Sequence, residues 1–283
     1  MNQQGMSVRQ RIENAINERF GEKIAAAGTV AGSEELARIV EHRSHRKYTQ
    51  QPVDAGLLRL LFACALSAPS KSDLQQADIV QVADRGKLKA IVDLIPSMPW
   101  INDAPVFLVF CGNNRRIRQI GLIRGKPFAN DHLDHFMNAA VDAGLVLMNF
   151  IRAAEAAGLG CCPISAVRNH PGQVSELLML PDHVFPVAGL TVGYPAQCGQ
   201  ITPRLPLDVT VHTDRFDETM LTEKIDSYDH RRHALQPYRK QRHVARYGTA
   251  EFYGWSEDKA RQYGVPERAD FGEFIRAKGF NLA

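Results

Sequence analysis

The sequence predicts an α+β protein, because strands and helices follow one another without the regular strand–helix–strand repeat of a parallel α/β sheet. A continuous apolar run at 106–111 is typical of a central strand that is covered on both faces. An alanine-rich segment at 130–157 is the longest predicted helix. Hydrophobic residues make up 45% and charged residues 23% of the 283-residue chain, which is ordinary for a soluble globular protein.

The first part of the chain is predicted to be helical. Residues 7–25 have apolar side chains at helical spacing, and a glycine-containing break follows at 28–33. Ser33 is placed to cap a second short helix. A third helix begins after Asp54 and ends at 67–69, because the proline in that stretch cannot continue it.

The central part of the chain supplies the predicted sheet. Alternating apolar and polar residues at 77–83 indicate a strand, and a short helix at 87–94 links it to the strand at 106–111. The helix at 130–157 is apolar nearly all round, so we expect it to be buried centrally or at a subunit contact. Gly158 follows it as a C-cap.

The remaining predicted elements are shorter. Residues 164–167 form either a strand or the turn into a small helix at 174–180, and a buried strand follows at 185–193. From Gln197 onward we expect a polar, irregular excursion that ends in a helix around 271–277.

These changes of pattern divide the chain into three parts. We expect an N-terminal helical arm over 1–35, a core over 36–216, and a C-terminal excursion over 217–283. The arm has an apolar face that needs a partner surface, and the excursion is expected to pack on the core or on a partner subunit.

Composition argues against several classes of protein. The net charge is only +3, and the arginines are scattered among acids, so no basic stripe for nucleic acid is present. No apolar run is long enough to cross a bilayer, and the N-terminus lacks the apolar region of a signal peptide. The five cysteines have neither metal-site nor disulfide spacing, so we expect reduced, buried thiols in a cytoplasmic protein.

Four hydrogen-bond donors stand together at the start of the core: His42, Arg43, Ser44 and Arg46. The planar fork of an arginine pairs bidentately with a phosphate group, and the ring of His42 adds another donor. A solvated surface turn has the same composition, and by itself the cluster favours that simpler interpretation.

A second polar cluster follows the third predicted helix and comprises Ser70, Lys71, Ser72 and Gln75. A side-chain amide such as that of Gln75 matches an imide edge, which offers both donor and acceptor atoms, as in a flavin. Taken alone, this cluster is better explained as an ordinary polar loop.

Two further segments complete the set. Small residues at 158–165 let backbone N–H groups approach a flat ring, although a structural turn would use the same residues. Arg204, between prolines, is either a second phosphate ligand or the partner in a rim salt bridge. Together the separated clusters predict a pocket for an anionic, ring-bearing cofactor. The absence of a glycine-rich dinucleotide fingerprint and of a Walker motif argues against a Rossmann or P-loop site.

Two other catalytic interpretations are weaker. Cys161 and Cys162 are a candidate nucleophile pair, but adjacent cysteines in an apolar turn are more often inert. Asp131, Asp134 and His135 have the chemistry of metal ligands, but no later cluster completes a site. Helix-surface polarity therefore explains these three residues better.

Taken in order, the segments resemble the FMN-dependent nitroreductase family, and within it the oxygen-insensitive, NADPH-using nitroreductases and flavin reductases. The resemblance covers about residues 38–216. No single motif is diagnostic, but their shared order and spacing is hard to explain by chance. The motifs are His42-Arg-Ser-x-Arg46, Ser70-x-Ser72-x-x-Gln75, Gly158-Leu-Gly160 continuing to Arg168-Asn169, Leu178-x-Leu-Pro-x-His-Val-x-Pro186, Gly193-x-Pro195 and Pro203-Arg-Leu-Pro206.

The resemblance implies a nitroreductase-like α/β sandwich with a mixed central sheet. It also implies an intertwined homodimer with two FMN molecules at the subunit interface. Carried over residue by residue, it assigns the FMN phosphate to His42, Arg43, Ser44, Arg46 and Arg204.

The resemblance also assigns the surroundings of the flavin ring. Ser70, Ser72 and Gln75 border the ribityl chain and ring. One face of the ring is lined by Pro163, Ile164, Ser165 and Ala166, with the Ser165 N–H near flavin N5. A separate hypothesis, beyond the resemblance, is that Arg204 and Lys71 stabilise negative charge on the reduced flavin.

The implied activity is hydride transfer from NADPH or NADH through flavin N5 to a small acceptor. Nitroaromatic, quinone and flavin acceptors would be reduced by a ping-pong mechanism in which no side chain need act as acid or base. The chain departs from the subgroup at Pro163 and at Ser165-Ala166, where a tyrosine and paired glycines are frequent, and at Thr202, where lysine is frequent. Arg246 alone matches the arginines that bind the NADPH phosphate, so the choice between NADPH and NADH stays open.

Two rival functions remain. One is a flavin-binding protein of the same fold that lacks NAD(P)H reductase activity. The other is a non-enzymatic dimeric module whose arginines bind an acidic ligand. Bound FMN without NAD(P)H oxidation favours the first, and a colourless protein that cannot be reconstituted with FMN favours the second.

Overall fold

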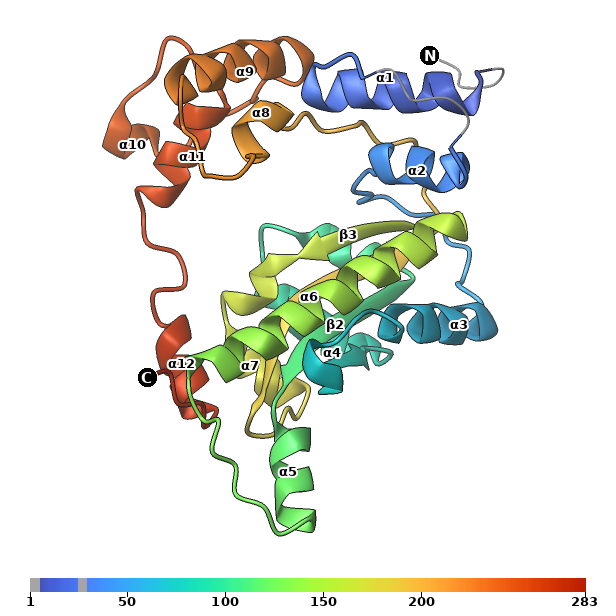
Figure 1. The fold of residues 1–283 in the computed structure, drawn as a ribbon, viewed down its shortest axis with the longest axis vertical. Coiled ribbons are helices and arrows are strands. Elements are labelled where there is room, and N and C mark those ends of the chain that lie inside the picture. The colour runs from blue at the N-terminus through green and yellow to red at the C-terminus, as the bar shows by residue number, and fades with distance from the viewer. Residues whose placement is uncertain (1–5, 25–29) are drawn as a thin grey trace. The chain divides into compact units, whose positions relative to one another are not determined.

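The computed structural model describes residues 6–24 and 30–283 (Figure 1). The chain forms two compact units. The first contains the described residues up to Arg43 together with Gln200–Glu267, and the second contains Ser44–Gly199 together with Arg268–Ala283. The second unit holds the sheet.

The sheet has four strands in the order β1-β2-β4-β3, and all three pairings are antiparallel. The expected α+β class is confirmed, whereas the sheet is antiparallel rather than mixed. Among the described residues, parallel pairing occurs only as an isolated bridge between Ser44 and Cys161. Apolar patterns locate strands but do not specify their direction, which explains the difference. The strands are β1 (Ala77–Gln81), β2 (Val106–Asn113), β3 (Gly160–Ile164) and β4 (Val184–Gly193).

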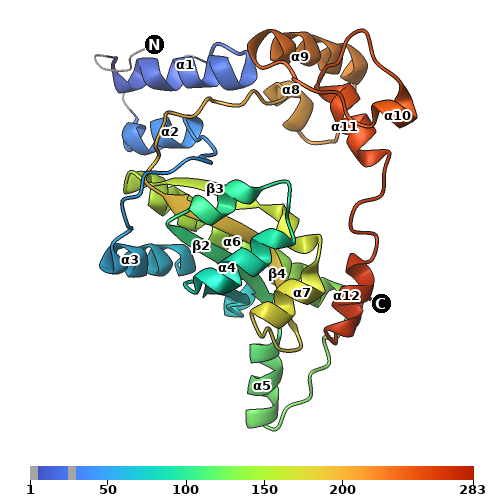
Figure 2. The same ribbon diagram turned by 180° about the vertical axis from the view of Figure 1, so that it is seen from behind.

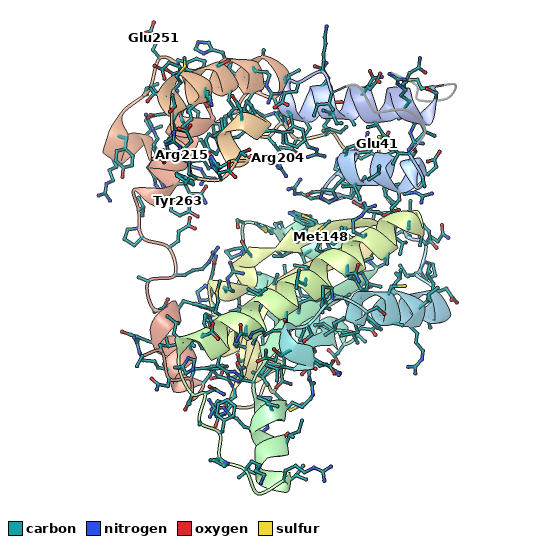
Figure 3. All side chains as sticks on the ribbon, viewed as in Figure 1. Glu41, Met148, Arg204, Arg215, Glu251 and Tyr263 are labelled. Atoms are coloured by element: carbon teal, nitrogen blue, oxygen red, sulfur yellow. The ribbon has the colours of Figure 1, made fainter. Side chains whose placement is uncertain are left out.

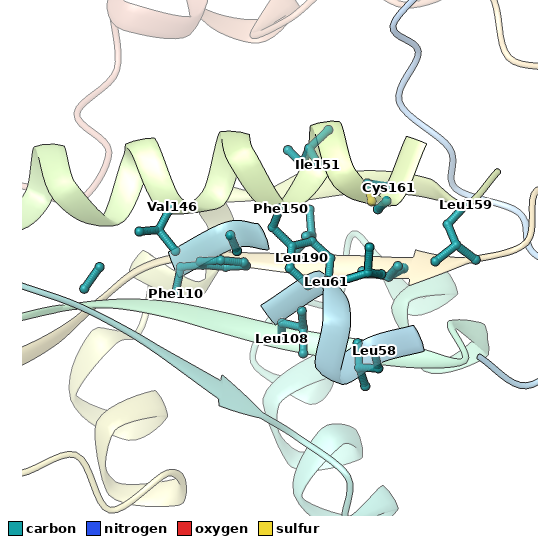
Figure 4. Packing of buried hydrophobic residues seen from close by; sticks show 14 of the residues in the cluster. Leu58, Leu61, Leu108, Phe110, Val146, Phe150, Ile151, Leu159, Cys161 and Leu190 are labelled. Carbon is teal, nitrogen blue, oxygen red and sulfur yellow. The ribbon is translucent and has the colours of Figure 1, made fainter. Parts of the chain in front are cut away.

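Strand β2 is buried on both faces, as its continuous apolar sequence predicts. Leu108 and Phe110 point into one core, which contains Phe150 and Leu190 (Figure 4). Their neighbours along the strand, such as Phe107, belong to a second core on the opposite face. Because successive side chains of a strand alternate in direction, one apolar run serves both cores.

Helices cover both faces of this sheet (Figures 1 and 2). Helices α3 and α6 contribute to the core with Phe110, and α4 contributes to the opposite core. The side chain of Asp54 accepts a hydrogen bond from the Leu57 N–H at 2.8 Å and so caps α3. The predicted helices of this unit are confirmed, and their bounds are α3 (Ala55–Leu66), α4 (Arg85–Asp93), α6 (Leu133–Ala156), α7 (Pro171–Leu177) and α12 (Phe271–Ala277).

Helix α6 is buried on one face only. Ala143, Val146 and Phe150 pack on the sheet. The opposite face carries an exposed apolar row, which we call the α6 stripe. Its members are Leu133, Met137, Val141, Leu145 and Met148. Met148 is labelled in Figure 3. Among the described residues, α6 is the one helix long and apolar enough to cross a membrane, a test that core helices of soluble proteins also pass.

In this unit the structure decides one open alternative and adds one helix. Strand β3 begins at Gly160, and Ser165–Arg168 form a 3₁₀ turn, so 164–167 is mainly the turn into α7. Helix α5 (Arg115–Ile123) was not predicted. None of its residues is buried, although its apolar side chains gather on one side of the helix.

The first unit begins with α1 (Val8–Phe20), which Ser7 caps through a hydrogen bond from the Gln10 N–H. Helix α2 (Ser33–Val40) packs on α1, and Arg11 of α1 pairs with Glu41 at 2.7 Å. The predicted Ser33 cap is wrong. Gly32 is the N-cap, and the Ser33 hydroxyl instead donates to the Val30 carbonyl. Residue 25 and the first part of the predicted break at 28–33 lie outside the described residues.

The region after Gln197 alternates between irregular segments and helices, so the expected irregular excursion with a helix at its end is only partly right, because α8 to α11 were not predicted. Helix α9 buries only Tyr228 and Asp229, and a helix with so small a buried face has little apolar periodicity to read. The helices of this region in the first unit are α8 (Leu207–Thr210), α9 (Leu221–Leu235), α10 (Val244–Tyr247) and α11 (Trp255–Tyr263).

The imidazole of His135 makes the fold sensitive to acid. It is buried on α6, 4.7 Å from the Phe128 ring, and its Nε2 has no hydrogen-bond partner among the described residues. Burial lowers the pKa of His135, and the charge of Arg118 lowers it further. The unfolded chain therefore takes up this proton at a higher pH than the folded chain, and stability is lost as the pH falls below about 6.5.

We expect the free energy of unfolding to fall between about pH 7.5 and about pH 5.5, and to fall less in His135→Phe. Urea denaturation across this range measures both slopes. At about pH 8 the histidine is neutral in both states, so the comparison there isolates the packing cost of the substitution. An unchanged slope in the variant would contradict this account.

Candidate functional site

The polar loop between α3 and β1 is held by a buried carboxylate. Asp142 of α6 is 2% exposed and accepts three hydrogen bonds from this loop. The donors are the Ser70 hydroxyl at 2.7 Å, the Lys71 N–H at 3.1 Å and the Gln76 N–H at 3.3 Å. A buried carboxylate is tolerated where donors satisfy it, so Asp142 fixes the course of the loop.

The backbone of this loop is strained. Ser72, Asp73 and Gln75 have φ values of 49°, 57° and 50°, in the left-handed region that side chains rarely adopt. The Gln75 N–H donates to the Ser70 hydroxyl at 2.7 Å, which closes the loop on itself. Strain of this kind persists where surrounding contacts enforce it, and it gathers at functional sites.

A cavity of about 570 Å³ opens beside the loop. Ser70, Gln75 and Asp142 line it, together with Val146 and the side chain of Arg116. Its volume is within the range of small-molecule sites. The Gln75 amide donates to the Asp73 carboxylate at 3.2 Å, and the side chains of Lys71 and Ser72 are exposed.

The segment that follows Arg43 lies along the edge of β3. The His45 N–H donates to the Cys161 carbonyl at 2.9 Å, next to the bridge between Ser44 and Cys161. A Cβ atom on Gly160 would lie 2.7 Å from the His45 ring, so this approach requires glycine. The structure therefore brings Ser44 and Arg46 to the segment that also carries residues 163–166.

Residues 163–166 span the end of β3 and the turn that follows. Pro163 and Ser165 are exposed, whereas Ile164 and Ala166 are buried. The exposed pair alternates with the buried pair, so this segment offers a surface at two positions and is anchored at the other two.

The first unit holds the other predicted phosphate ligands. Arg19 of α1 donates to the His42 carbonyl at 2.6 Å, and the Arg204 N–H donates to the Arg19 carbonyl at 2.6 Å. The Nε of Arg43 is buried and has no hydrogen-bond partner among the described residues. The side chain of Arg204 is exposed, and no described carboxylate pairs with it (Figure 3).

Arg246 lies on α10 in the same unit and is exposed, with its guanidinium 5.4 Å from the Tyr247 ring. No hydrogen bond or ion pair of the Arg246 guanidinium occurs in the described parts of the chain, and nothing in the structure tests its role. The assignment of Arg246 to NAD(P)H therefore stays a prediction.

The structure argues against the nucleophile interpretation of Cys161 and Cys162. Both side chains are buried, and burial raises the pKa of each thiol, although the charge of Arg46 opposes the shift at Cys162. A buried thiol with a raised pKa is a poor nucleophile at neutral pH. Cys64 and Cys198 are exposed, so the expectation that the thiols are buried is wrong for these two.

In the described parts of the chain, no three acids, histidines or cysteines gather. Asp131 instead pairs with Arg118 at 2.5 Å, and that guanidinium lowers the pKa of the carboxyl group. His135 is buried against Phe128.

Sequence reasoning missed two residues that organise the site. Asp142 is an acid within the longest, largely apolar helix, a position where a buried and satisfied carboxylate is the usual explanation. Arg19 is a basic residue near the end of an amphipathic helix, and nothing in the sequence distinguishes it from a solvated one.

Comparisons with known proteins place these features in context. The family model described as "Nitroreductase family" matches residues 39–194, and the model of its C-terminal domain matches residues 202–283. The "FMN reductase [NAD(P)H]" of Bacillus subtilis is 34% identical over 253 residues, covering 88% of this chain and 99% of that protein.

Solved structures agree. The structure of Bacillus megaterium NfrA2 has a TM-score of 0.80 and 31% identity, and the match covers 88% of this chain and 99% of that one. The NADPH:FMN oxidoreductase from Vibrio harveyi, solved in complex with NAD⁺, has a TM-score of 0.76 and 29% identity. That match covers 87% of this chain and 97% of the Vibrio protein.

Proposed function

This chain belongs to the nitroreductase family, and on that premise we propose that it is an FMN-dependent oxidoreductase. It takes hydride from NADPH or NADH and reduces a nitroaromatic, quinone or flavin acceptor in a ping-pong sequence. The similarity over 88% of the chain to an FMN reductase that uses NAD(P)H is the observation that carries the proposal.

The residues present fit an FMN phosphate. The buried Nε of Arg43 lacks a partner in the described parts of the chain, and such a donor is costly unless a ligand satisfies it. No described carboxylate pairs with Arg43, Arg46, Lys71 or Arg204, so their charges are available to an anion. His42 and Ser44 add donors of the kind that phosphate oxygens accept.

When bound, FMN supplies the hydride chemistry at N5, and the protein binds and orients it. The loop fixed by Asp142 presents Ser70, Ser72 and Gln75 as polar contacts for the ribityl chain and ring. Lys71 provides positive charge for the reduced state. Pro163 and Ser165 offer their exposed surface to one face of the ring, while Ile164 and Ala166 anchor the segment.

We also propose a homodimer, supported by the α6 stripe. Five large apolar side chains in one row on the longest helix are an exposed patch of the kind that a subunit partner covers. A second copy of this chain presents the same row, so two rows related by a two-fold axis would cover each other.

Three further assignments belong to this proposal. The arm over 1–35 and the excursion over 217–283 flank the FMN-binding core. The protein is cytoplasmic, as its five free cysteines suggest. Its partners are small molecules and a second subunit, with neither nucleic acid nor membrane among them.

Steady-state kinetics test the proposed reaction. With NADPH varied at several fixed quinone concentrations, we expect parallel lines in double-reciprocal plots, because the donor leaves before the acceptor binds. NADH is assayed in the same way, and the ratio of the two kcat/KM values gives the donor preference. Intersecting lines would contradict the ping-pong sequence, and no NAD(P)H oxidation with any acceptor would contradict the reductase.

A further inference from the structure

The N-terminal helix α1 is an addition to the family pattern. The family model begins at residue 39, after α1 and at the C-terminal end of α2. The Bacillus subtilis relative is covered over 99% of its length by 88% of this chain. Within the first unit, however, α1 makes specific polar contacts with segments that the family model does include.

Arg19 of α1 makes most of these contacts. Its side chain is 7% exposed, and its guanidinium donates to the carbonyl oxygens of Val40 at 3.1 Å, His42 at 2.6 Å and Thr202 at 3.2 Å. These carbonyls belong to two chain segments that are about 160 residues apart in sequence. One guanidinium therefore joins both segments, and a planar fork with five donors is suited to this task.

The main chain of Arg19 strengthens the junction. Its carbonyl accepts the Arg204 N–H at 2.6 Å and the guanidinium of Arg231 at 3.3 Å. Arg231 in turn donates to the Arg204 carbonyl at 2.7 Å. The peptide on each side of Arg204 is thus held by a residue outside the loop that carries it.

The two joined segments are those that carry predicted phosphate ligands. His42 and Arg43 lie on one, and Arg204 lies on the other. The guanidinium of Arg19 is occupied by backbone carbonyls, so it is not itself a phosphate ligand. Holding both segments in place before the ligand arrives removes the entropy that binding would otherwise cost.

We propose that Arg19 is a positioning residue for the phosphate group of the flavin, and that the added arm serves to preorganise that end of the site. The inference rests on the proposed function, since it requires Arg43 and Arg204 to meet the phosphate. It extends that function by assigning a role to a helix outside the family model.

The test compares FMN with riboflavin, which lacks the phosphate. The full-length protein is titrated with each flavin, and binding is followed by quenching of flavin fluorescence. We expect Arg19→Gln to weaken FMN binding by about tenfold or more, as the loss of a charged hydrogen bond implies. Riboflavin binding should stay within about twofold, because the ring and ribityl contacts lie elsewhere.

Two matched variants sharpen the result. Arg9→Gln changes an exposed arginine of the same helix, which pairs with Glu13, and we expect both affinities to stay at the wild-type values. Arg19→Lys keeps the charge without the planar fork, and we expect a smaller loss of FMN affinity. If Arg19→Gln fails to fold, the flavin titrations of Arg19→Lys provide the test.

Each outcome either supports or overturns the positioning role of Arg19. A selective loss of FMN affinity supports the positioning role. Parallel losses for FMN and riboflavin, or no loss for either, overturn it while leaving the proposed function in place. A wild-type chain that binds both flavins equally overturns the phosphate site, and the role of Arg19 with it.

Discussion

Replacing Arg43 with alanine is expected to weaken FMN binding by about a hundredfold or more. A charged hydrogen bond contributes roughly 1.5–3 kcal/mol, and a bidentate arginine makes two, so the loss spans two to four powers of ten. The Nε of Arg43 has no partner in the described parts of the chain. Its removal therefore breaks no hydrogen bond of that nitrogen in the flavin-free protein, and we expect the stability of that form to be retained.

Fluorescence titration of the flavin-free protein measures this effect, and Arg38→Ala is the matched control. Arg38 lies in the same unit, is exposed and pairs with Glu35 at 3.6 Å. Its removal should leave FMN affinity unchanged, because surface pairs contribute little. If Arg43→Ala retained FMN as tightly as the control, Arg43 would not be a phosphate ligand.

Replacing Val141 with glutamate is expected to convert the proposed dimer into a monomer. Val141 lies in the middle of the α6 stripe and is 45% exposed. In a subunit contact its replacement would bury an unpaired carboxylate, which costs several kcal/mol for each subunit. We expect flavin to be lost together with the dimer, because the family resemblance places FMN at the subunit interface.

Analytical ultracentrifugation gives the oligomeric state, and the ratio of visible to ultraviolet absorbance gives the flavin content. Met179→Glu is the control, since Met179 is 78% exposed and lies outside the stripe. A Val141→Glu protein that stayed dimeric would show that another surface forms the contact. A wild-type protein that is monomeric and binds FMN would contradict the proposed homodimer.

Much of the fold can be predicted from sequence where burial is one-sided or complete. The run at 106–111 became β2 because its neighbours cover both faces, and the helix after Asp54 has a cap that sequence alone reveals. The C-terminal helices were missed because α9 buries two residues of fifteen, which leaves little periodicity. Strand direction could not be predicted from the sequence either, because it depends on contacts between distant segments.

The residues of the candidate site also fall into those that the sequence could identify and those that it could not. Residues with unusual chemistry in short clusters, such as Ser44 and Arg46, could be named from spacing and from family resemblance. The residues that hold those clusters in place could not be named from the sequence. Asp142 and Arg19 act through backbone groups that are close in space and distant in sequence, and any acid or arginine has the same appearance in a sequence.

The central claim is that this chain is an FMN protein reduced by NAD(P)H, and a visible spectrum tests it most directly. The purified protein is examined first alone, and then after anaerobic addition of NADPH and of NADH in separate cuvettes. We predict a yellow protein whose flavin absorbance is bleached by at least one of the two donors. A yellow protein bleached by neither would contradict the reductase and favour a flavin-binding protein. A protein that stays colourless after incubation with FMN and removal of the excess would contradict the cofactor itself.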